Sequence, residues 1–342
     1  MRNTFPVFDL HCDTAVALSD TNQVWAENNL HIDLNKESKL FSHTQVYSFC
    51  CVYDEHGDAL TGPEAEAKFI RCISNFYSEL AKHSDTHKLC RTADDLLEAA
   101  KEGKHGVFLS LEGPEVIGCD PGRLDELKDL GIVMTTLTWN HANLLAGSHK
   151  TGEGLTAQGK AFVRRAQELG IIIDVSHLSE QAFWDICDIS MSPIVASHSN
   201  SRAICDHSRN LTDRQFKTIC NFDGLVGLNL YRPFLTTAAT ATYDDVRRHA
   251  EHFIGLGGKH HLSLGFDLDG CDELPEGFRD LSDCNGLGKA LIEGGMDEQL
   301  VLNLMNNNAA RFFLQYLQRR NVGEFLQMDE LTRQLNEINV NT

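Results

Sequence analysis

Apolar runs rich in β-forming residues recur eight times along the chain, and amphipathic stretches separate them. Most of the runs are continuously hydrophobic, as expected of parallel strands that are covered on both faces. The expected strands span residues 7–11, 45–53, 106–112, 132–139, 171–176, 193–198, 225–231 and 261–267. The expected helices span residues 62–82, 92–102, 121–130, 156–169, 179–189, 212–221 and 243–256.

The boundaries of these helices carry residues that commonly cap helices. Good N-cap residues precede four of them: Thr92, Thr156, Ser179 and Thr212. Gln215 completes a capping box with Thr212. Glycines stand where three helices are expected to end: Gly103, Gly131 and Gly170. The capping residues therefore support the helices that the apolar pattern predicts.

Eight strand–helix repeats predict an α/β fold, the (β/α)₈ TIM barrel, as one domain over residues 1–342. A helical extension is expected from about residue 297 to residue 342. The segments 14–43 and 234–242 do not fit the repeat and would lie over the barrel mouth. A doubly wound open sheet is the alternative, but no glycine-rich phosphate loop follows the first strand.

Composition narrows the class of protein. Hydrophobic residues make up 42% of the 342 residues and charged residues 23%, as in ordinary soluble proteins. A formal net charge of −19 argues against a nucleic-acid surface. The oligomeric state stays open, a homodimer included.

The cysteines and the N-terminus indicate the compartment. Eleven cysteines without a CxxC pair suit free thiols in a reducing cytosol better than a disulfide framework. The first residues show no signal peptide, and no apolar run reaches 18 residues. The sequence thus predicts a cytoplasmic protein without a membrane segment.

Residues that can bind a metal or move a proton stand at the ends of five expected strands. They are His11, Asp13, Glu112, His177, His198 and Asp267. In a barrel the carboxyl ends of all strands meet at one face, so these side chains are expected to converge. Imidazole together with carboxylate suits Zn²⁺, with Mn²⁺, Fe²⁺ or Co²⁺ as other occupants. Taken singly, His177 and His198 could each instead be a hydrogen-bonded core histidine, and Glu112 a structural residue paired with an arginine.

The neighbours of these residues suggest supporting tasks. Cys12 points to the opposite face of its strand and is expected to pack, and Asp269 is expected to serve a turn. Asp9 and Asp174 lie within strands and could orient ligands or pair with Arg. Arg209 follows the sixth strand and could bind a substrate carboxylate with its planar fork, or form a loop salt bridge.

Six motifs occur in an order that matches a known family: HCDT, SLEGPE, LTWNHAN, IDVSHLS, SHSNSR followed by SRNLTD, and GFDLDG. Over nearly its full length the chain resembles the membrane (renal) dipeptidases, peptidase family M19. The resemblance implies a (β/α)₈ barrel with two Zn²⁺ ions that activate a water to hydrolyse dipeptides. It also implies tolerance of a C-terminal D-residue. Mammalian members are secreted and lipid-anchored, and this chain lacks both signals.

Carried over by position, the resemblance makes His11 and Asp13 ligands of one zinc and Glu112 the bridge between the two. His177 and His198 would hold the second zinc. Asp267 would be the acid and base, and Arg209 would bind the substrate carboxylate. Many members have a substrate-binding His where this chain has Trp139, so His141 becomes the candidate for that contact, with Asn140 as a rival.

Two other functions compete with a dipeptidase. One is another amide or ester hydrolase on the same barrel, such as a lactonase or an N-acyl-amino-acid hydrolase. A neutral lactone does not need Arg209, so loss of Arg209 should spare a lactonase. The other is a non-enzymatic protein that binds a metal or a peptide. Such a protein would not need Asp267, a further carboxylate beside the complete set of metal ligands.

Overall fold

The strands of the computed structural model, which describes residues 2–54 and 56–318, form a single parallel sheet. They are β1 (Pro6–Cys12), β2 (Ser42–Cys50), β3 (His87–Leu89), β4 (His105–Glu112), β5 (Ile132–Thr136), β6 (Ile172–Asp174), β7 (Ile194–Ala196), β8 (Leu225–Leu228) and β9 (Leu262–Leu264). Over this part of the chain, eight of them close into a barrel in the order β2-β1-β9-β8-β7-β6-β5-β4, with β2 paired back to β4. The predicted TIM barrel is therefore confirmed, and the open sheet is excluded.

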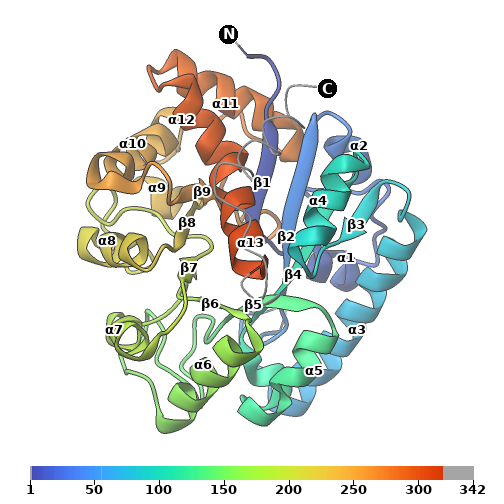
Figure 1. Ribbon diagram of the computed structural model, residues 1–342, viewed down its shortest axis with the longest axis vertical. Helices are drawn as coiled ribbons and strands as arrows, with labels where there is room; N and C mark the ends of the chain where they lie inside the picture. The colour runs from blue at the N-terminus through green and yellow to red at the C-terminus, as the bar shows by residue number, and fades with distance from the viewer. Residues whose placement is uncertain (1, 55, 319–342) are drawn as a thin grey trace.

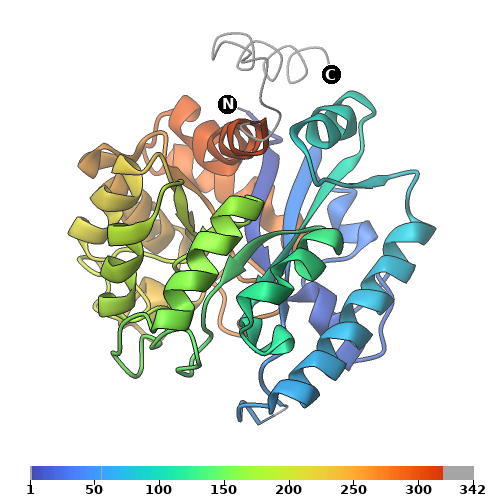
Figure 2. The ribbon, with the colours of Figure 1, turned by 60° about the horizontal axis from the view of Figure 1, so that its bottom comes forward.

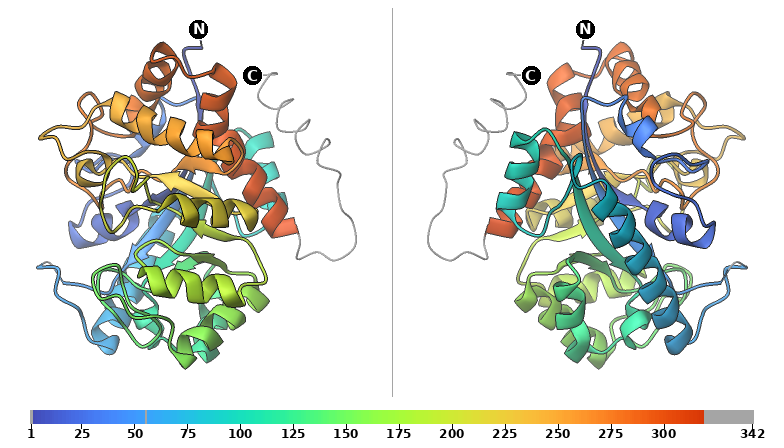
Figure 3. Two further views of the ribbon diagram at one scale, coloured as in Figure 1. Left: turned by 90° about the vertical axis from the view of Figure 1, so that its left-hand side faces the viewer. Right: turned by 90° about the vertical axis from the view of Figure 1, so that its right-hand side faces the viewer.

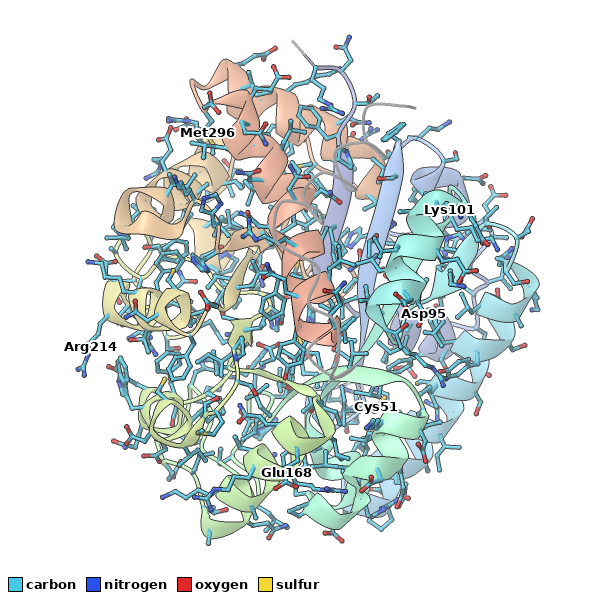
Figure 4. All side chains as sticks on the ribbon, viewed as in Figure 1. Cys51, Asp95, Lys101, Glu168, Arg214 and Met296 are labelled. Atoms are coloured by element: carbon cyan, nitrogen blue, oxygen red, sulfur yellow. The ribbon has the colours of Figure 1, made fainter. Side chains whose placement is uncertain are left out.

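Helices surround the strands on all sides, as the two side views show (Figure 3). They are α1 (Thr14–Asp20), α2 (Leu34–Glu37), α3 (Gly62–Lys82), α4 (Ala93–Lys101), α5 (Leu124–Asp129), α6 (Ala157–Leu169), α7 (Glu180–Ile189), α8 (Asp213–Asn221), α9 (Arg232–Leu235), α10 (Tyr243–Phe253), α11 (Cys284–Glu293), α12 (Glu298–Leu302) and α13 (Asn308–Gln318). Charged side chains such as Glu168 on α6 and Arg214 on α8 lie at the outer rim, whereas Cys51 is buried (Figure 4).

The predicted caps are present. The side chains of Thr92, Thr156, Ser179 and Thr212 each accept a hydrogen bond from the backbone three residues on, and Gln215 closes the capping box. Gly103, Gly131 and Gly170 follow α4, α5 and α6 with φ of 68°, 82° and 65°. A residue with a Cβ adopts this left-handed conformation only at a cost, which explains the glycines.

The barrel interior is apolar at its amino-terminal end, and α13 covers that end. Inward side chains such as Phe8 of β1 and Phe108 of β4 pack against Phe313 of α13 at ring-centroid distances of 5.1 and 4.6 Å. Figure 1 looks onto this end, with α13 in front of the strands, and Figure 2 shows the same helix across the end of the barrel. Because one end is filled by side chains, the opposite end is left for a site.

The strands are shorter than predicted at their carboxyl ends. The runs expected to reach residues 176 and 267 stop at Asp174 and Leu264. His177 and Asp267 have φ of 67° and 64°, which no strand residue adopts, so the chain turns there. The candidate residues after β6, β7 and β9 consequently lie two or three positions beyond the strands rather than at their last residue.

Further elements differ from the prediction in detail. The three-residue strand β3 beside β4 was not predicted, because a run of three residues gives no apolar pattern. The expected helix after residue 297 is α12 and α13, joined by a π-helical turn at Asn303–Asn307. The last part of the expected extension, 319–342, lies outside the described residues.

The sequence predicted free cysteines and no membrane segment, and the structure bears on both. All eleven cysteines lie in the described part of the chain and are free, and nine of them are buried. Among the described helices, none combines the length and the apolar character needed to span a bilayer.

Candidate metal centre

The predicted metal-binding side chains meet at the carboxyl ends of the strands. His11 lies in β1 and Asp13 just after it, and Glu112 is the last residue of β4. His177 and His198 follow β6 and β7. All five residues are buried. The barrel therefore brings together residues that are up to 187 positions apart in the chain, and does so on one face.

Glu112, His177 and His198 form a group that we call the histidine group. The Nε2 atoms of the two rings are 2.9 Å apart, and Oε1 of Glu112 lies 2.8 Å from Nε2 of His177 and 3.7 Å from Nε2 of His198. The other ring nitrogen of His198 lies 2.7 Å from Oγ of Ser197, which itself donates to Asp174. Ser197 can therefore only accept from His198, so Nε2 of that ring bears a lone pair.

The ring of His177 follows the same logic. Its Nδ1 lies 3.1 Å from the side-chain amide of Asn140; with Oδ1 of that amide facing the ring, the proton sits on Nδ1 and the lone pair on Nε2. Two ring lone pairs and a carboxylate oxygen then face one another within 3.7 Å. Such an arrangement is repulsive unless a cation lies between the atoms, and His with Glu is a donor set that suits Zn²⁺.

His11, Asp13 and Asp267 form a second group, the carboxylate group. Nε2 of His11 lies 3.5 Å from Oε2 of Glu112, 3.8 Å from Oδ2 of Asp13 and 3.9 Å from Oδ1 of Asp267. Glu112 thus presents one oxygen to each group. Among the described residues, Nε2 of His11, Oδ1 of Asp13 and Oε1 of Glu112 are buried without a hydrogen-bond partner. Orphaned buried donors and acceptors of this kind are costly, and metal ligation would satisfy them.

The electrostatics of the two groups favour positive charge. Burial lowers the pKa of His11, but the charge of Glu112 and the hydrogen bond to Asp13 outweigh it and raise that pKa well above the usual value. Burial raises the pKa of Asp267 to about 7, where the charges of Asp13 and Glu112 act in the same direction and that of His11 against it. Burial also raises the pKa of Asp13, whereas the charges of His177 and His11 outweigh burial and hold the pKa of Glu112 low. Two of the three carboxylates therefore resist ionisation, and a nearby cation would favour their charged form.

Backbone geometry holds these side chains. His177 and Asp267 both adopt left-handed φ, a conformation that costs non-glycine residues free energy and is concentrated at functional sites. A Cβ on Gly270 would collide with the carboxylates of Asp13 and Asp267, so only glycine fits behind them. Asn229 donates from Nδ2 to Oδ2 of Asp267 at 2.9 Å and fixes that carboxylate.

The three aspartates that we did not assign to the site support its frame. Asp174 accepts from the backbone of Ser176 and Ser197 at 2.9 and 3.0 Å, and Asp9 accepts from the backbone of Phe266 at 2.9 Å. Asp174 orients His198 through Ser197, as expected of a residue that orients ligands. Asp269 accepts from Thr14 and from the backbone of His31, which ties the segment 14–43 to the turn after β9.

Arg209 lies beside the histidine group and is buried. Its Nη2 lies 3.4 Å from the carbonyl oxygen of His198, and its guanidinium stands 5.5 Å from the ring of Phe234. Burial lowers its pKa to about 10, and the charges of Glu112 and Asp267 counteract part of that effect. Its Nε has no hydrogen-bond partner within the described chain, so a buried cationic donor is available to an anion.

His141 is not brought into either group. Its Nε2 lies 3.3 Å from the carbonyl oxygen of Gly57, and its ring stands beside Trp139 at 5.6 Å. Trp139 stacks on Tyr53 at 4.2 Å and lies 6.4 Å from the ring of His177. Trp139, which stands where the resemblance expects a histidine, is thus an aromatic side chain beside His177, and His141 contacts the loop of Gly57.

Four residues around the site were not recognised as parts of it from the sequence: Asn140 as a partner of His177, His149, Ser197 and Asn229. Ser197 directly precedes His198, and Asn140 belongs to the motif LTWNHAN, so position offered a weak signal for these two. His149 enters from a loop and carries no sequence signal of its own, whereas Asn229 directly follows β8 and, as a polar residue at the end of an apolar run, offered one.

A (β/α)₈ barrel whose strand ends gather histidines and carboxylates in two adjoining groups is the layout of a metal-dependent hydrolase. The chain matches the membrane dipeptidase family, peptidase family M19, over residues 1–322, and it belongs to that family.

Individual relatives agree with this assignment. A metallopeptidase of Rhodobacter sphaeroides, solved with a phosphinate mimic of the dipeptide L-Ala-D-Ala, superposes with a TM-score of 0.83 at 28% identity, covering 92% of this chain and 99% of that one. An uncharacterised protein of Acinetobacter calcoaceticus is 30% identical over 73% of this chain and 89% of its own length. The dipeptidase tcpJ of Claviceps purpurea is 30% identical over 67% of this chain and 55% of its own.

Proposed function

We propose that this protein is a binuclear zinc dipeptidase that also accepts a D-residue at the C-terminal position. The observation that carries the proposal is the position of Glu112, which offers one oxygen to the histidine group and the other to the carboxylate group. The phosphinate mimic of L-Ala-D-Ala bound by the Rhodobacter relative supports the substrate class.

The proposed ligands are those that the family resemblance implies, and the two groups of side chains support them. His11 and Asp13 would hold one zinc, His177 and His198 the other, and Glu112 would bridge them. Zinc bound there would lower the pKa of a water molecule and polarise the scissile carbonyl.

Asp267 and Arg209 would act on water and substrate. Asp267 faces His11 without a close contact, at 3.9 Å, and is held from behind by Asn229. It would accept the proton that the attacking water loses and return it to the leaving amine. Arg209 would bind the free carboxylate and so restrict the enzyme to dipeptides. We leave His141 out of the proposal, because its ring nitrogen faces Gly57.

We expect two zinc ions per chain in the unchelated protein. Five ligands in two adjoining groups exceed what one tetrahedral ion requires. Elemental analysis of the purified protein, together with turnover of a dipeptide panel on the same sample, tests both parts of the proposal. Chelation should abolish turnover, and zinc should restore it. A reproducible stoichiometry of one would contradict the binuclear centre, and hydrolysis of lactones or N-acyl amino acids in place of dipeptides would contradict the substrate.

We expect Arg209→Ala to lower kcat/KM for a dipeptide by about 10–150-fold, because a charge-assisted hydrogen bond to the carboxylate is worth about 1.5–3 kcal/mol. The C-terminal amide of the same dipeptide should be a poor substrate of the wild type and should change little in the variant. Arg214→Ala is the matched control, since Arg214 is exposed on α8 and its guanidinium packs over Trp184, at 4.2 Å. Equal rates on dipeptide and amide would remove Arg209 from substrate binding.

A further inference from the structure

A chain of hydrogen bonds leads from the metal centre to the loop that carries Arg209. Oδ1 of Asn140 lies 3.1 Å from Nδ1 of His177 and 2.9 Å from Nε2 of His149. The other nitrogen of His149, Nδ1, lies 2.8 Å from Oγ of Ser208, the residue before Arg209. Four side chains from three loops are thereby connected in series.

The protons along this chain can be arranged in two ways. In the first, both rings donate to Oδ1 of Asn140, and His149 accepts from Ser208 at Nδ1. In the second, the amide is turned over and its NH₂ donates to both rings, which places the proton of His177 on Nε2. That proton would point at Oε1 of Glu112, 2.8 Å away, and would block ligation. Only the first arrangement leaves His177 able to bind a cation.

Hydrogen bonds also hold the backbone next to this series of side chains. The N–H of His149 donates to the carbonyl oxygen of His177 at 2.7 Å, and Oγ of Ser148 donates to the carbonyl oxygen of Asn140 at 2.9 Å. These backbone hydrogen bonds hold Asn140 and His149 against the segment of His177.

We propose that Asn140 and His149 are positioning residues, which hold His177 in its metal-binding tautomer and tie the loop of Arg209 to the metal centre. The inference rests on the proposed function, since it assigns His177 to the metal and Arg209 to the substrate. Partners of this kind orient metal-ligating histidines in many proteins, and their loss weakens metal binding.

The first test compares Asn140→Leu with Asn140→Asp in the full-length protein. Leucine has a similar shape but no acceptor, whereas a carboxylate still accepts from both rings. Zinc affinity, measured by competition with a chromophoric chelator, should fall by about 10–100-fold in Asn140→Leu and be retained in Asn140→Asp. Nitrogen NMR of the His177 ring should show the proton on Nδ1 in wild type and Asn140→Asp, and both tautomers in Asn140→Leu. His141→Phe, in the same loop, should leave zinc affinity unchanged.

The second test addresses the connection to Arg209. His149→Phe removes the hydrogen bond to Ser208, so KM for a dipeptide should rise by about 2–12-fold with a smaller change in kcat. The same variant should not change KM for the C-terminal amide, which lacks the carboxylate that Arg209 binds. An equal rise on both substrates would overturn this half of the inference.

The outcomes separate the inference from the proposed function. If the wild type neither binds zinc nor cleaves dipeptides, the proposed function is wrong and the inference fails with it. If the wild type does both, unchanged zinc affinity in Asn140→Leu overturns the inference alone. A variant that raises KM without weakening zinc binding would make Asn140 a substrate contact instead.

Discussion

Changing Asp267 to Asn is expected to slow dipeptide hydrolysis by about 10²–10⁴-fold, the usual contribution of general acid–base catalysis. The amide has nearly the same shape as the carboxylate, and the site has no room for a larger group, because Gly270 packs directly behind it. Asn229 can still hydrogen-bond the oxygen of the new side chain. The substitution thus removes the ability of residue 267 to take up a proton but keeps its contacts with Gly270 and Asn229.

The measurement is kcat on a dipeptide together with the metal content of the same sample. Asp269→Asn is the matched control, since Asp269 has the same left-handed backbone, with φ of 66°, but is engaged with Thr14 and His31. It should keep most of the turnover. Loss of zinc from Asp267→Asn would show that Asp267 is a ligand, and the proton would then need another acceptor.

The barrel was predictable because its strands are buried on both faces. A strand of that kind must be apolar throughout, so β4 and β8 appear as continuous runs in the sequence. The three-residue strand β3 gave no such run, and the carboxyl ends were overestimated where apolar residues continue past the last paired position. The turns at His177 and Asp267 depend on left-handed backbone that a hydrophobic pattern does not reveal.

The residues that meet at the carboxyl ends of the strands were predictable for a related reason. A charged or imidazole side chain at the end of a buried strand has few structural explanations, so His11 and Glu112 stood out in the sequence. Polar residues that contact these side chains from loops do not stand out in the sequence, because loops are polar along most of their length. His149 reaches His177 and Ser208 through a loop whose course the sequence does not reveal, and its position in space could only come from the fold.

A second polar cluster, at the opposite end of the barrel, should matter for stability rather than for catalysis. Glu37 of α2 is buried and accepts from Nδ1 of His43 at 3.0 Å and from Nε2 of His87 at 2.9 Å, and the hydroxyl of Tyr47 lies 3.4 Å away. His43 and His87 stand near the start of β2 and at the start of β3, at the end covered by α13. Glu37 and His43 are only six positions apart, but His87 lies 50 positions from Glu37, so no local motif predicted the cluster.

The hydrogen bonds of this cluster surround the ring of His43 with acceptors. The amide nitrogen of Gln45 donates to the carbonyl oxygens of Asp9 and Val46, so its Oε1 is the atom that faces Nε2 of His43 at 3.1 Å. His43 therefore faces an acceptor at each ring nitrogen, and one of these acceptors is the carboxylate of Glu37. Removing one partner of such a buried pair leaves the other charge uncompensated.

We expect Glu37→Ala to lower the free energy of unfolding by about 3–5 kcal/mol near neutral pH, the usual cost of breaking a buried ion pair from one side. Glu98→Ala is the control: Glu98 pairs with Lys88 at 2.8 Å but is 54% exposed, and exposed pairs contribute about 0–1 kcal/mol. Urea unfolding of both variants measures the difference. Equal losses in the two variants would contradict the assignment of a buried charge pair.

The pH dependence of that loss has a definite sign. Burial alone would raise the pKa of Glu37, but the hydrogen bonds and charges of His43 and His87 outweigh it and hold the pKa well below the ordinary 4.5. A carboxyl group with a lowered folded pKa stabilises the protein above its unfolded pKa, and this contribution disappears as the pH falls through the folded value. The stability difference between wild type and Glu37→Ala should therefore be full above about pH 4.5 and shrink below it. A difference that instead grows on acidification would mean that Glu37 is protonated in the folded protein, and the charge pair with His43 would then be wrong.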